Sequence, residues 1–481
     1  MFLGIDIGTT RVKEILVDES GNIVEKKSRE IRLEFGDNGE VEVDPGRWIR
    51  TIIDLSRNFD LSRVEGIGLS GQMHTLVLID RQGKPLRKAI IWADARGKKE
   101  EDFLRENFSK DILTRCGSVP SRSFTLVKLL YVLKNENIDK DNCKLCLSKD
   151  FIGGWFTKNF DTERTDASAT LMYDITEDHW YTDLMEELKV PESILPDVHK
   201  SLEVRGYLGK DIAELLNMRE GIPVVYGAGD QEAAAFGVGV SDVDEVMLSL
   251  STGGQIIVPV KKPIIDRSVH NFLHIHGFHI MGAIQNLGLV LKWANNVFGF
   301  KGFEDLTERA LLSMPGANGV IFLPYITPER TPIMKSDVKG YLTDLRLCNT
   351  RSDIARAILE GVSFALVDAW KTVERLTKLS NPSVFVLGGV AKNPIIREII
   401  FPFLSGNINL FNGEFDASCY GAALMAKGNL KILEDIKKYR NRFIIEKIRS
   451  FNNVTYAKPF ERFLELRKKI LNLKEENDHD K

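Results

Sequence analysis

Short runs of β-branched and aromatic residues, broken by glycine-rich turns, recur along the chain and predict many buried strands. The most informative run is Pro223–Tyr226, which ends at a turn with Gly227 and Gly229 and is followed by Asp230 and an apolar segment, 231–236. We therefore expect a strand, a turn and a helix. Asp230 would either cap that helix or lie in a ligand crevice at the carboxyl end of the strand, where the helix N-terminus would keep it ionised.

The first residues of the chain predict a meander of three strands, at Phe2–Ile7, Val12–Val17 and from Ile23 onward. The turn between the first two is made of small and hydroxyl-bearing residues, Gly8, Thr9 and Thr10. Backbone N–H groups and hydroxyls at such a turn suit an anion such as a phosphate, although many hairpins carry Gly-Thr. Asp6 would lie at the same rim.

The same device recurs at Val246–Leu250 and Gln255–Val260, joined by the turn 251–254, which contains Thr252 and Gly253. We interpret the repeat as an internal duplication. It predicts an α/β protein of two domains, residues 1–243 and 244–481. Each domain would open with a phosphate-type hairpin, and the two would face each other across a central cleft.

Between the hairpins, the segment 67–79 reads as strand, turn and strand, and the turn carries Gln72, Met73 and His74. A single histidine is often a satisfied structural group. A polyhydroxylated ligand, however, needs donors and acceptors in this kind of mixture. Further along, 124–131 predicts an amphipathic helix, Lys149-Asp150 precedes another, and 165–168 reads as a polar loop or cap.

The second half contains a long amphipathic helical pattern at 353–376, with its apolar residues on one stripe, and a buried strand at Val384–Leu387. The strand stops before a helix whose first turn suits Pro394. Such a junction lets a backbone approach a flat ligand such as a nucleotide, although tight packing would need the same glycines. The junction contains Gly388, Gly389 and Asn393. A small-residue helix at 416–424 and a tail of surface helices from Asn429, frayed at 475–481, complete the prediction.

Composition narrows the class of protein. The 481 residues are 43% hydrophobic and 28% charged with a net charge of −3, which argues against a nucleic-acid or membrane surface as the main partner. No apolar run approaches a membrane span, the N-terminus does not resemble a signal peptide, and five scattered cysteines fit a reducing compartment. We expect a cytoplasmic protein. Neither the lone Cys143-x-x-Cys146 nor the histidines at 270–279 favour a metal site, and a homodimer stays open.

These residues together resemble the FGGY family of carbohydrate kinases. The resemblance runs in order from Phe2 to about Lys427, and its most specific pieces are the N-terminal hairpin, the Gly71–His74 loop and Gly229-Asp-Gln. Other matching segments are Trp92-Ala-Asp-Ala-Arg, Phe322-Leu-Pro-Tyr, Leu359-Glu-Gly-Val and Leu387-Gly-Gly-Val-Ala-Lys-Asn. The resemblance implies the actin-like architecture of two ribonuclease-H-like domains around a closing cleft.

The resemblance also implies the roles of particular residues. Asp230 would be the catalytic base, and Asp6 would hold Mg²⁺ through water. Phosphates of ATP would lie at Gly8, Thr9, Thr10, Thr252 and Gly253. The adenosine would face Gly388, Gly389 and Asn393. The sugar site would contain Gln72, Met73, His74, Asp230 and Gln231, with Asp94 and Arg96 supporting the loop.

The substrate follows less directly from the resemblance. Gln72-Met73-His74 resembles the ketopentose kinases, so phosphorylation of a primary hydroxyl of D-xylulose is the first expectation. Gln231 is instead the choice of glycerol kinases. Arg11, Ser251-Thr-Gly-Gly and Tyr131 also depart from the usual family pattern. Ribulose, another ketose or glycerol therefore remain alternatives, and so does a non-catalytic, ATP-switched sugar sensor, because one fold hosts many functions.

Overall fold

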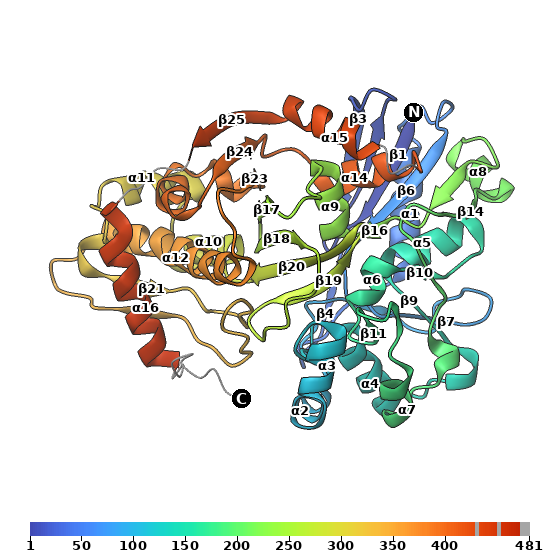
Figure 1. Ribbon diagram of the computed structural model, residues 1–481, viewed down its shortest axis with the longest axis horizontal. Coiled ribbons are helices and arrows are strands. Elements are labelled where there is room, and N and C mark those ends of the chain that lie inside the picture. The colour runs from blue at the N-terminus through green and yellow to red at the C-terminus, as the bar shows by residue number, and fades with distance from the viewer. Residues whose placement is uncertain (429–431, 450–453, 472–481) are drawn as a thin grey trace.

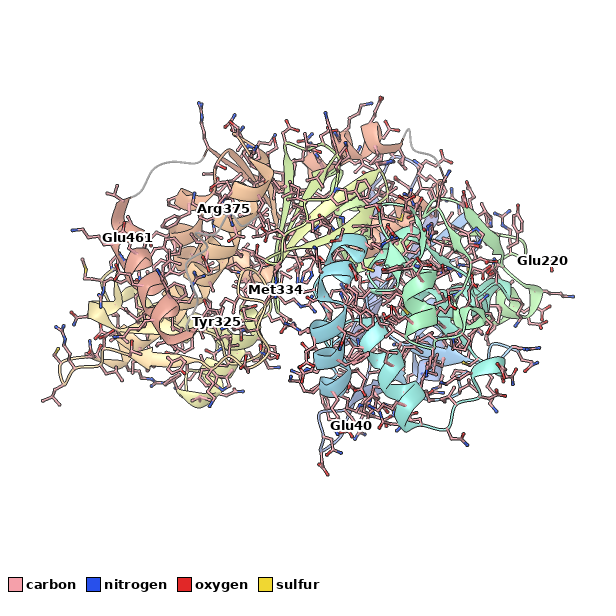
Figure 2. The ribbon with its side chains drawn as sticks, turned by 60° about the horizontal axis from the view of Figure 1, so that its bottom comes forward. Glu40, Glu220, Tyr325, Met334, Arg375 and Glu461 are labelled. Carbon is pink, nitrogen blue, oxygen red and sulfur yellow. The ribbon has the colours of Figure 1, made fainter. Side chains whose placement is uncertain are left out.

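The computed structural model describes residues 1–428, 432–449 and 454–471. Two seven-stranded sheets form its two lobes, and helices cover them (Figure 1). Glu220 and Glu461 lie at opposite ends of the molecule, whereas Met334 lies near its middle (Figure 2). The longer strands thus belong to two separate sheets.

The first sheet is built from residues of the N-terminal half. Its strand order is β14 (Val204–Tyr207), β15 (Pro223–Val225), β6 (Gly66–Gly71), β1 (Phe2–Ile7), β2 (Arg11–Val17) and β3 (Ile23–Glu30), with β16 (Ala228–Gly229) also paired to β6. Strands β1, β2 and β3 form an antiparallel meander, and β6 and β15 continue the sheet in parallel. The predicted meander is confirmed.

The second sheet repeats this order. It runs β19 (His270–His274), β20 (Gly277–Ile284), β18 (Gly254–Val260), β17 (Glu245–Leu250), β23 (Ser383–Leu387), β24 (Asn407–Phe411) and β25 (Ile444–Arg449). Strands β17, β18 and β20 form the antiparallel meander, and β23 and β24 follow in parallel. The two sheets therefore share one topology, and the predicted pair of ribonuclease-H-like domains is confirmed.

Smaller strands form short pairs around the two sheets. They are β4 (Glu34–Phe35), β5 (Val41–Val43), β7 (Val77–Ile79), β8 (Ala89–Ile90), β9 (Lys144–Cys146), β10 (Thr162–Glu163), β11 (Tyr173–Asp174), β12 (His179–Trp180), β13 (Val198–His199), β21 (Ile321–Leu323) and β22 (Tyr341–Thr343). Most of them belong to the N-terminal lobe, where β7 pairs with β9 and β5 with both β4 and β8.

The helices surround both sheets. In the N-terminal half they are α1 (Pro45–Ser56), α2 (Lys98–Asn107), α3 (Ser109–Cys116), α4 (Thr125–Asn135), α5 (Ser148–Thr157), α6 (Arg164–Ser168), α7 (Thr182–Glu187), α8 (Lys210–Leu216) and α9 (Asp230–Val238). Those that follow are α10 (Gly288–Val297), α11 (Phe303–Leu311), α12 (Arg351–Thr377), α13 (Pro394–Ile400), α14 (Ala417–Met425), α15 (Ile432–Tyr439) and α16 (Ala457–Leu471).

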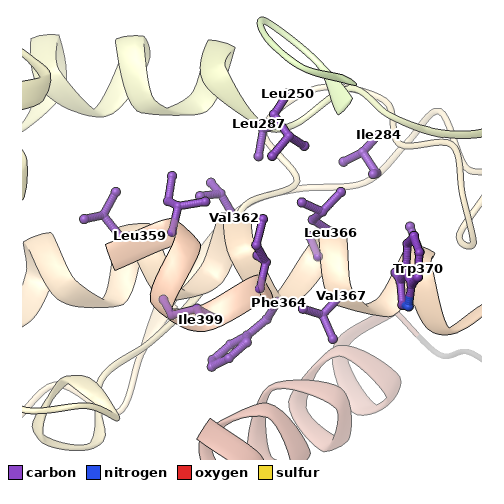
Figure 3. Packing of buried hydrophobic residues seen from close by; sticks show 14 of the residues in the cluster. Leu250, Ile284, Leu287, Leu359, Val362, Phe364, Leu366, Val367, Trp370 and Ile399 are labelled. Carbon is purple, nitrogen blue, oxygen red and sulfur yellow. The ribbon is translucent and has the colours of Figure 1, made fainter. Parts of the chain in front are cut away.

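The long helix α12 forms the centre of the C-terminal core. Thr350 and Asp353 make a capping box at its start, which satisfies two backbone N–H groups that a helix otherwise leaves free. Leu366 faces Ile284 and Leu287 on one side of the helix, and Phe364 points away from them towards α16 (Figure 3). The expected single apolar stripe is therefore incomplete, because 355–370 is buried on all sides between two layers.

The tail also differs from the prediction. It forms helices α15 and α16, as expected, but β25 between them adds a strand to the edge of the second sheet. The frayed segment 475–481 lies outside the described residues. The two halves of the chain also do not separate cleanly, because α14, far along in sequence, packs against α9, β1 and β6 of the N-terminal lobe (Figure 1).

Glycines make the contact of α14 with the N-terminal lobe possible. A Cβ atom on Gly421 would lie 1.8 Å from the carbonyl oxygen of Ala233 on α9, and one on Gly68 would lie 1.8 Å from that of Ala422. Gly4 faces Cys419 in the same way, at 2.2 Å. Helix α14 therefore lies backbone to backbone on its neighbours, as the small-residue pattern at 416–424 predicts.

One buried carboxyl belongs to the frame of the N-terminal lobe. Glu14 on β2 is fully buried, and the Ser56 hydroxyl contacts both of its oxygens at 3.1 and 3.2 Å. Burial raises the pKa of Glu14 to about 8, although Ser56 and the charge of Lys27 oppose the shift. Glu14 is therefore largely a neutral hydrogen-bonding group at pH 7.

Substitution of Gly421 by alanine should destabilise the protein strongly. The added methyl group would overlap the backbone of α9, so α14 would have to move away from the sheet. We expect Gly421→Ala to lower the free energy of unfolding by about 3 kcal/mol or more in denaturant titrations. Gly209→Ala is the matched control, because its Cβ would meet one atom at 3.7 Å, and it should cost about 1 kcal/mol or less. Equal losses for the two variants would contradict the packing argument.

Candidate functional site

Strand register brings the two candidate acidic residues to one end of the first sheet, at the carboxyl ends of β1 and β16. This end of the sheet is called the sheet edge below. Asp6 on β1 lies opposite Ser70 on β6, and Ser70 lies opposite Ala228 on β16. Asp230 follows β16 directly and begins α9. Because neighbouring strands are about 4.8 Å apart, the two acids stand about 10 Å from each other across the sheet edge. The edge is the carboxyl end of parallel strands, where such sheets bind ligands.

Asp230 is the first residue of α9, and its side chain does not cap the helix. The N-cap residue is Gly229, which has no side chain to offer. The capping interpretation of Asp230 is therefore wrong. Burial, together with the negative charge of Asp6, raises the pKa of Asp230 to about 7, against the opposing effects of Gln231 and Lys13. The expectation that a helix N-terminus keeps Asp230 ionised is corrected accordingly, because desolvation and like charge outweigh the helix end.

Asp6 is buried and held by residues that the sequence analysis did not single out. Ser70 donates to one of its oxygens at 3.0 Å, and Ser418 on α14 donates to the other at 2.9 Å. Lys13, which is its cross-strand partner on β2, lies 3.5 Å away and also pairs with Asp416 at 3.0 Å. Of these residues, Lys13 could have been predicted from the sequence, because the register of the first hairpin places it opposite Asp6. Ser418, 412 residues further along, gives no sequence signal.

The loop after β6 is buried beside these acids. Gln72 is 1% exposed, and among the described residues its amide group has no hydrogen-bond partner. Its backbone oxygen accepts a hydrogen bond from Ser148 at 3.0 Å. Met73 is also buried, and its Cγ would lie 3.0 Å from a Cβ on Gly229. The loop and the residue before Asp230 are thus in contact, and the Gln72 side chain keeps a donor and an acceptor free.

His74 has a fixed orientation. Its backbone adopts φ 65°, and its Nδ1 lies 2.6 Å from the carbonyl oxygen of Ala169. Burial, and then the positive charges of Arg330 and Lys128, hold the pKa of His74 well below its usual value, so the ring is neutral. Because a carbonyl can only accept, Nδ1 carries the proton and Nε2 remains an acceptor.

The two hairpin turns differ in how their hydroxyl groups are used. The Thr9 hydroxyl accepts a hydrogen bond of 2.8 Å from Trp92, whereas Thr10 is exposed. Gly8 beside them is half-buried. In the second turn Thr252 is exposed and Gly253 half-buried. The turns therefore present polar groups at the surface.

The glycine pair after β23 separates into two roles. Gly388 has φ 93°, and a Cβ there would lie 2.2 Å from the oxygen of Leu250, so tight packing explains it. A Cβ on Gly389 would meet no atom within 4 Å, which leaves open space above its backbone. Asn393 caps α13 through Ile395 and Ile396 and donates to Thr307 at 2.7 Å. Its side chain is thus committed to structure.

A charged cluster behind the site fixes α5 and α6. Fully buried Lys149 lies 2.8 Å from Asp150, 3.4 Å from Glu163 and 3.3 Å from Asp166. Lys149 and Asp150 lie inside α5 rather than before it. The segment 165–168 is part of the buried helix α6 and not a polar loop. The Thr165 hydroxyl donates to Glu163, the Ser168 hydroxyl donates to the Thr165 backbone oxygen, and Asp166 lies beside Lys149. The Thr165 hydroxyl accepts the Gly229 N–H at 3.1 Å, which anchors the residue before Asp230.

The loop that follows β8 is held by a second charged group. The Asp94 carboxylate is 3% exposed and accepts hydrogen bonds from the Val41 backbone at 2.7 Å and from the Arg96 guanidinium at 2.7 Å. Arg96 also pairs with Glu42 at 2.5 Å. These contacts join the loop after β8 to the segment 41–42, and the role of Asp94 and Arg96 in supporting the sugar loop stays a prediction.

The residue types at this edge fit a magnesium–nucleotide complex. Mg²⁺ binds few carboxylates directly and keeps much of its water, and Asp6 is a single buried carboxylate beside a hydroxyl-bearing turn. The open space above Gly389 suits a flat ring system. Among the described residues, no group of three or more histidine, cysteine or acidic side chains gathers as an all-protein metal site.

Comparison with known proteins defines the class. The model of the FGGY family of carbohydrate kinases, N-terminal domain, matches residues 1–237, and that of the C-terminal domain matches 246–427. The chain therefore belongs to the FGGY family of carbohydrate kinases. It is a phosphotransferase with ATP and a carbohydrate as its substrates. Within the described residues no helix is long and apolar enough to cross a membrane.

Particular relatives are similar over nearly their whole length. A xylulose kinase of Lactococcus lactis is 29% identical over 93% of this chain and 92% of its own. A xylulose kinase of Escherichia coli is 30% identical over 89% and 90%, respectively. The crystal structure of a xylulose kinase from Rhodospirillum rubrum superimposes with a TM-score of 0.87 at 25% identity and 98% coverage of both chains.

The raised pKa of Asp230 can be tested without turnover. We expect an infrared carboxyl-stretch signal that is present below pH 7 and disappears as the pH rises through about 7, because Asp230 then loses its proton. The signal should be absent from Asp230→Asn. In Asp6→Asn it should disappear at lower pH, because one neighbouring negative charge is removed. A midpoint near 4 in the wild-type protein would contradict the buried arrangement.

Proposed function

We propose that this protein transfers the γ-phosphoryl group of ATP to the primary hydroxyl at carbon 5 of D-xylulose. One observation carries the choice of sugar: the buried Gln72-Met73-His74 loop contacts the residue before Asp230 and offers an unpaired amide and a neutral imidazole. Neutral donors and acceptors suit the hydroxyls and keto group of an uncharged sugar. The similarity to proteins named xylulose kinase supports the same choice.

The proposed roles follow the sheet edge. Gln72, Met73, His74 and Gln231 would hold the sugar, with its reacting hydroxyl at Asp230. Asp6 would hold Mg²⁺ through water, and this ion would neutralise phosphate charge. Thr9, Thr10, Thr252 and the amides of Gly8 and Gly253 would receive the phosphates, and Gly388, Gly389 and Asn393 would border the adenosine. We assign the sugar to the domain 1–243 and the nucleotide mainly to 244–481.

Asp230 supplies the acid–base chemistry in this proposal. Phosphoryl transfer requires positioning, charge neutralisation and a group that accepts the hydroxyl proton. A pKa near 7 lets the Asp230 carboxylate accept this proton at neutral pH and release it after transfer. Below pH 7 Asp230 is increasingly protonated, so the rate should fall there. Closure of the two domains would exclude water and suppress ATP hydrolysis.

Two alternatives make different claims about the same site. Gln231 favours a glycerol-type substrate, and ribulose or another ketose would use the same donors. A sugar sensor without catalysis would not need both Asp6 and Asp230 at the sheet edge, and this chain has both. We therefore favour an enzyme.

We also propose that it works in the cytoplasm, where ATP is available and the five cysteines would remain reduced.

Replacement of the proposed base gives a direct test. We expect Asp230→Asn to lower kcat by about 100-fold or more, because the asparagine cannot accept the hydroxyl proton. Its sugar affinity, measured by calorimetry, should change little. Asp60→Asn is the control, since this exposed aspartate lies outside the site, and it should keep wild-type turnover. Undiminished turnover in Asp230→Asn would exclude Asp230 as the base.

A panel of acceptors identifies the substrate. Sugar-dependent ADP release should be measured with D-xylulose, D- and L-ribulose, erythrulose, L-fuculose, L-rhamnulose and glycerol. D-xylulose should give the highest kcat/KM. A preference for glycerol would mean that Gln231 decides specificity. Measurable ATP binding without release for any acceptor would instead support the sensor.

A further inference from the structure

Two buried side chains near the catalytic helix have no role in the chemistry proposed above. Glu232 on α9 and His279 on β20 are both fully buried, and His279 Nε2 lies 3.2 Å from Glu232 Oε1. Among the described residues, neither side chain makes a hydrogen bond of regular geometry, either with the other or with a third group. The 3.2 Å approach is therefore a close polar contact between two groups that are otherwise unpartnered. Because separating two buried polar groups would leave each facing apolar surroundings, such a contact constrains both elements.

The contact joins the two halves of the chain at the start of α9. Glu232 is two residues after Asp230, and its Oε2 would lie 2.8 Å from a Cβ on Gly229. Met73 packs over the same glycine. The Glu232 carboxyl therefore folds back over the first turn of the helix, directly beneath the residue that precedes the proposed base.

The partner side chain is rigidly placed. His279 lies on the second sheet, directly opposite Phe272 on β19, and its ring centroid is 5.8 Å from that of Phe272 and 5.8 Å from that of His274. Strand β19 in turn binds the N-terminal lobe: the Asn271 N–H donates to the Gly117 oxygen at 2.8 Å. The contact between His279 and Glu232 thus links the position of the second sheet to that of α9.

Both members of the pair are neutral. Burial raises the pKa of Glu232 well above its usual value, and the negative charges of Asp230, Asp166 and Glu163 act in the same direction. Burial likewise holds the pKa of His279 well below its usual value. A neutral carboxyl and a neutral imidazole can share one hydrogen bond at this distance without a buried ion pair.

We propose that Glu232 and His279 form an interdomain positioning pair that holds the first turn of α9, and with it Asp230, in the orientation needed to accept the proton. The inference rests on the proposed role of Asp230. The proposal gives the pair no contact with the sugar, because Glu232 and His279 contact each other and α9, whereas the sugar is assigned to the Gln72–His74 loop. Its effect should therefore appear in turnover rather than in sugar affinity.

The test compares variants that keep or remove the polar contact between the two side chains. Glu232→Gln retains a donor and an acceptor of the same size and should keep kcat within about threefold. Glu232→Ala and His279→Ala should each lower kcat by about tenfold or more, with the sugar Kd changed by less than about threefold, because a misplaced base slows the chemical step. The double alanine variant should be no slower than either single variant, since both remove one interaction.

Three further measurements separate positioning from general damage. Glu232→Leu combined with His279→Leu fills the same space with apolar groups, so it should fold and still turn over slowly. Glu360→Ala removes a buried carboxyl from α12, outside the proposed site, and should leave kcat unchanged once the protein is folded. In Glu232→Ala the infrared titration of Asp230 should also move to lower pH, because water enters beside it.

Several results would overturn the proposal. They are wild-type kcat in the double leucine variant, a loss in Glu232→Gln as large as that in Glu232→Ala, or a loss confined to sugar affinity. The infrared titration needs no turnover. If the wild-type protein phosphorylates no sugar, the proposed function fails, whereas an unchanged Asp230 titration in Glu232→Ala would contradict the positioning pair alone.

Discussion

The backbone contact of α14 with the N-terminal lobe is the constraint on which the site depends. Gly421 lets α14 touch α9, and Gly4 and Gly68 let it touch β1 and β6. These are the elements that carry Asp6, the Gln72 loop and Asp230. Side chains in place of these glycines would push α14 away from α9, β1 and β6, and Ser418 on α14 could no longer reach Asp6. Close packing therefore sets the geometry of the chemistry.

That geometry explains why two acids of the same edge behave differently. Asp6 receives two hydroxyl hydrogen bonds and has Lys13 beside it. Asp230 stands at the start of a helix but is desolvated and faces the charge of Asp6, which brings its pKa to about 7. In the proposed mechanism one carboxylate would hold a cation and the other would exchange a proton, in the way that environment separates acid and base roles elsewhere.

Much of the fold could be predicted from local patterns. The meander 2–30, the second hairpin 245–260 and the strand before Asp230 were predicted because alternation and turn residues act over a few positions. The failures have one physical cause: segments distant in sequence bury residues whose local pattern looks exposed. The segment 165–168 looks like a polar loop, yet it is buried, with Thr165 bonded to Glu163 and Asp166 beside Lys149. Similarly, the stripe of α12 understates its burial, because α16 covers the opposite side.

The sequence by itself determined the architecture, the family and the residues at the sheet edge, since these depend on periodicity, turns and ordered motifs. Only the tertiary structure decided which groups surround them. Ser418 meets Asp6, and His279 meets Glu232, across 412 and 47 residues of chain, respectively. No local pattern encodes such a contact. Protonation belongs to the same class, because desolvation and neighbouring charge fix a pKa, and both arise only when the chain has packed.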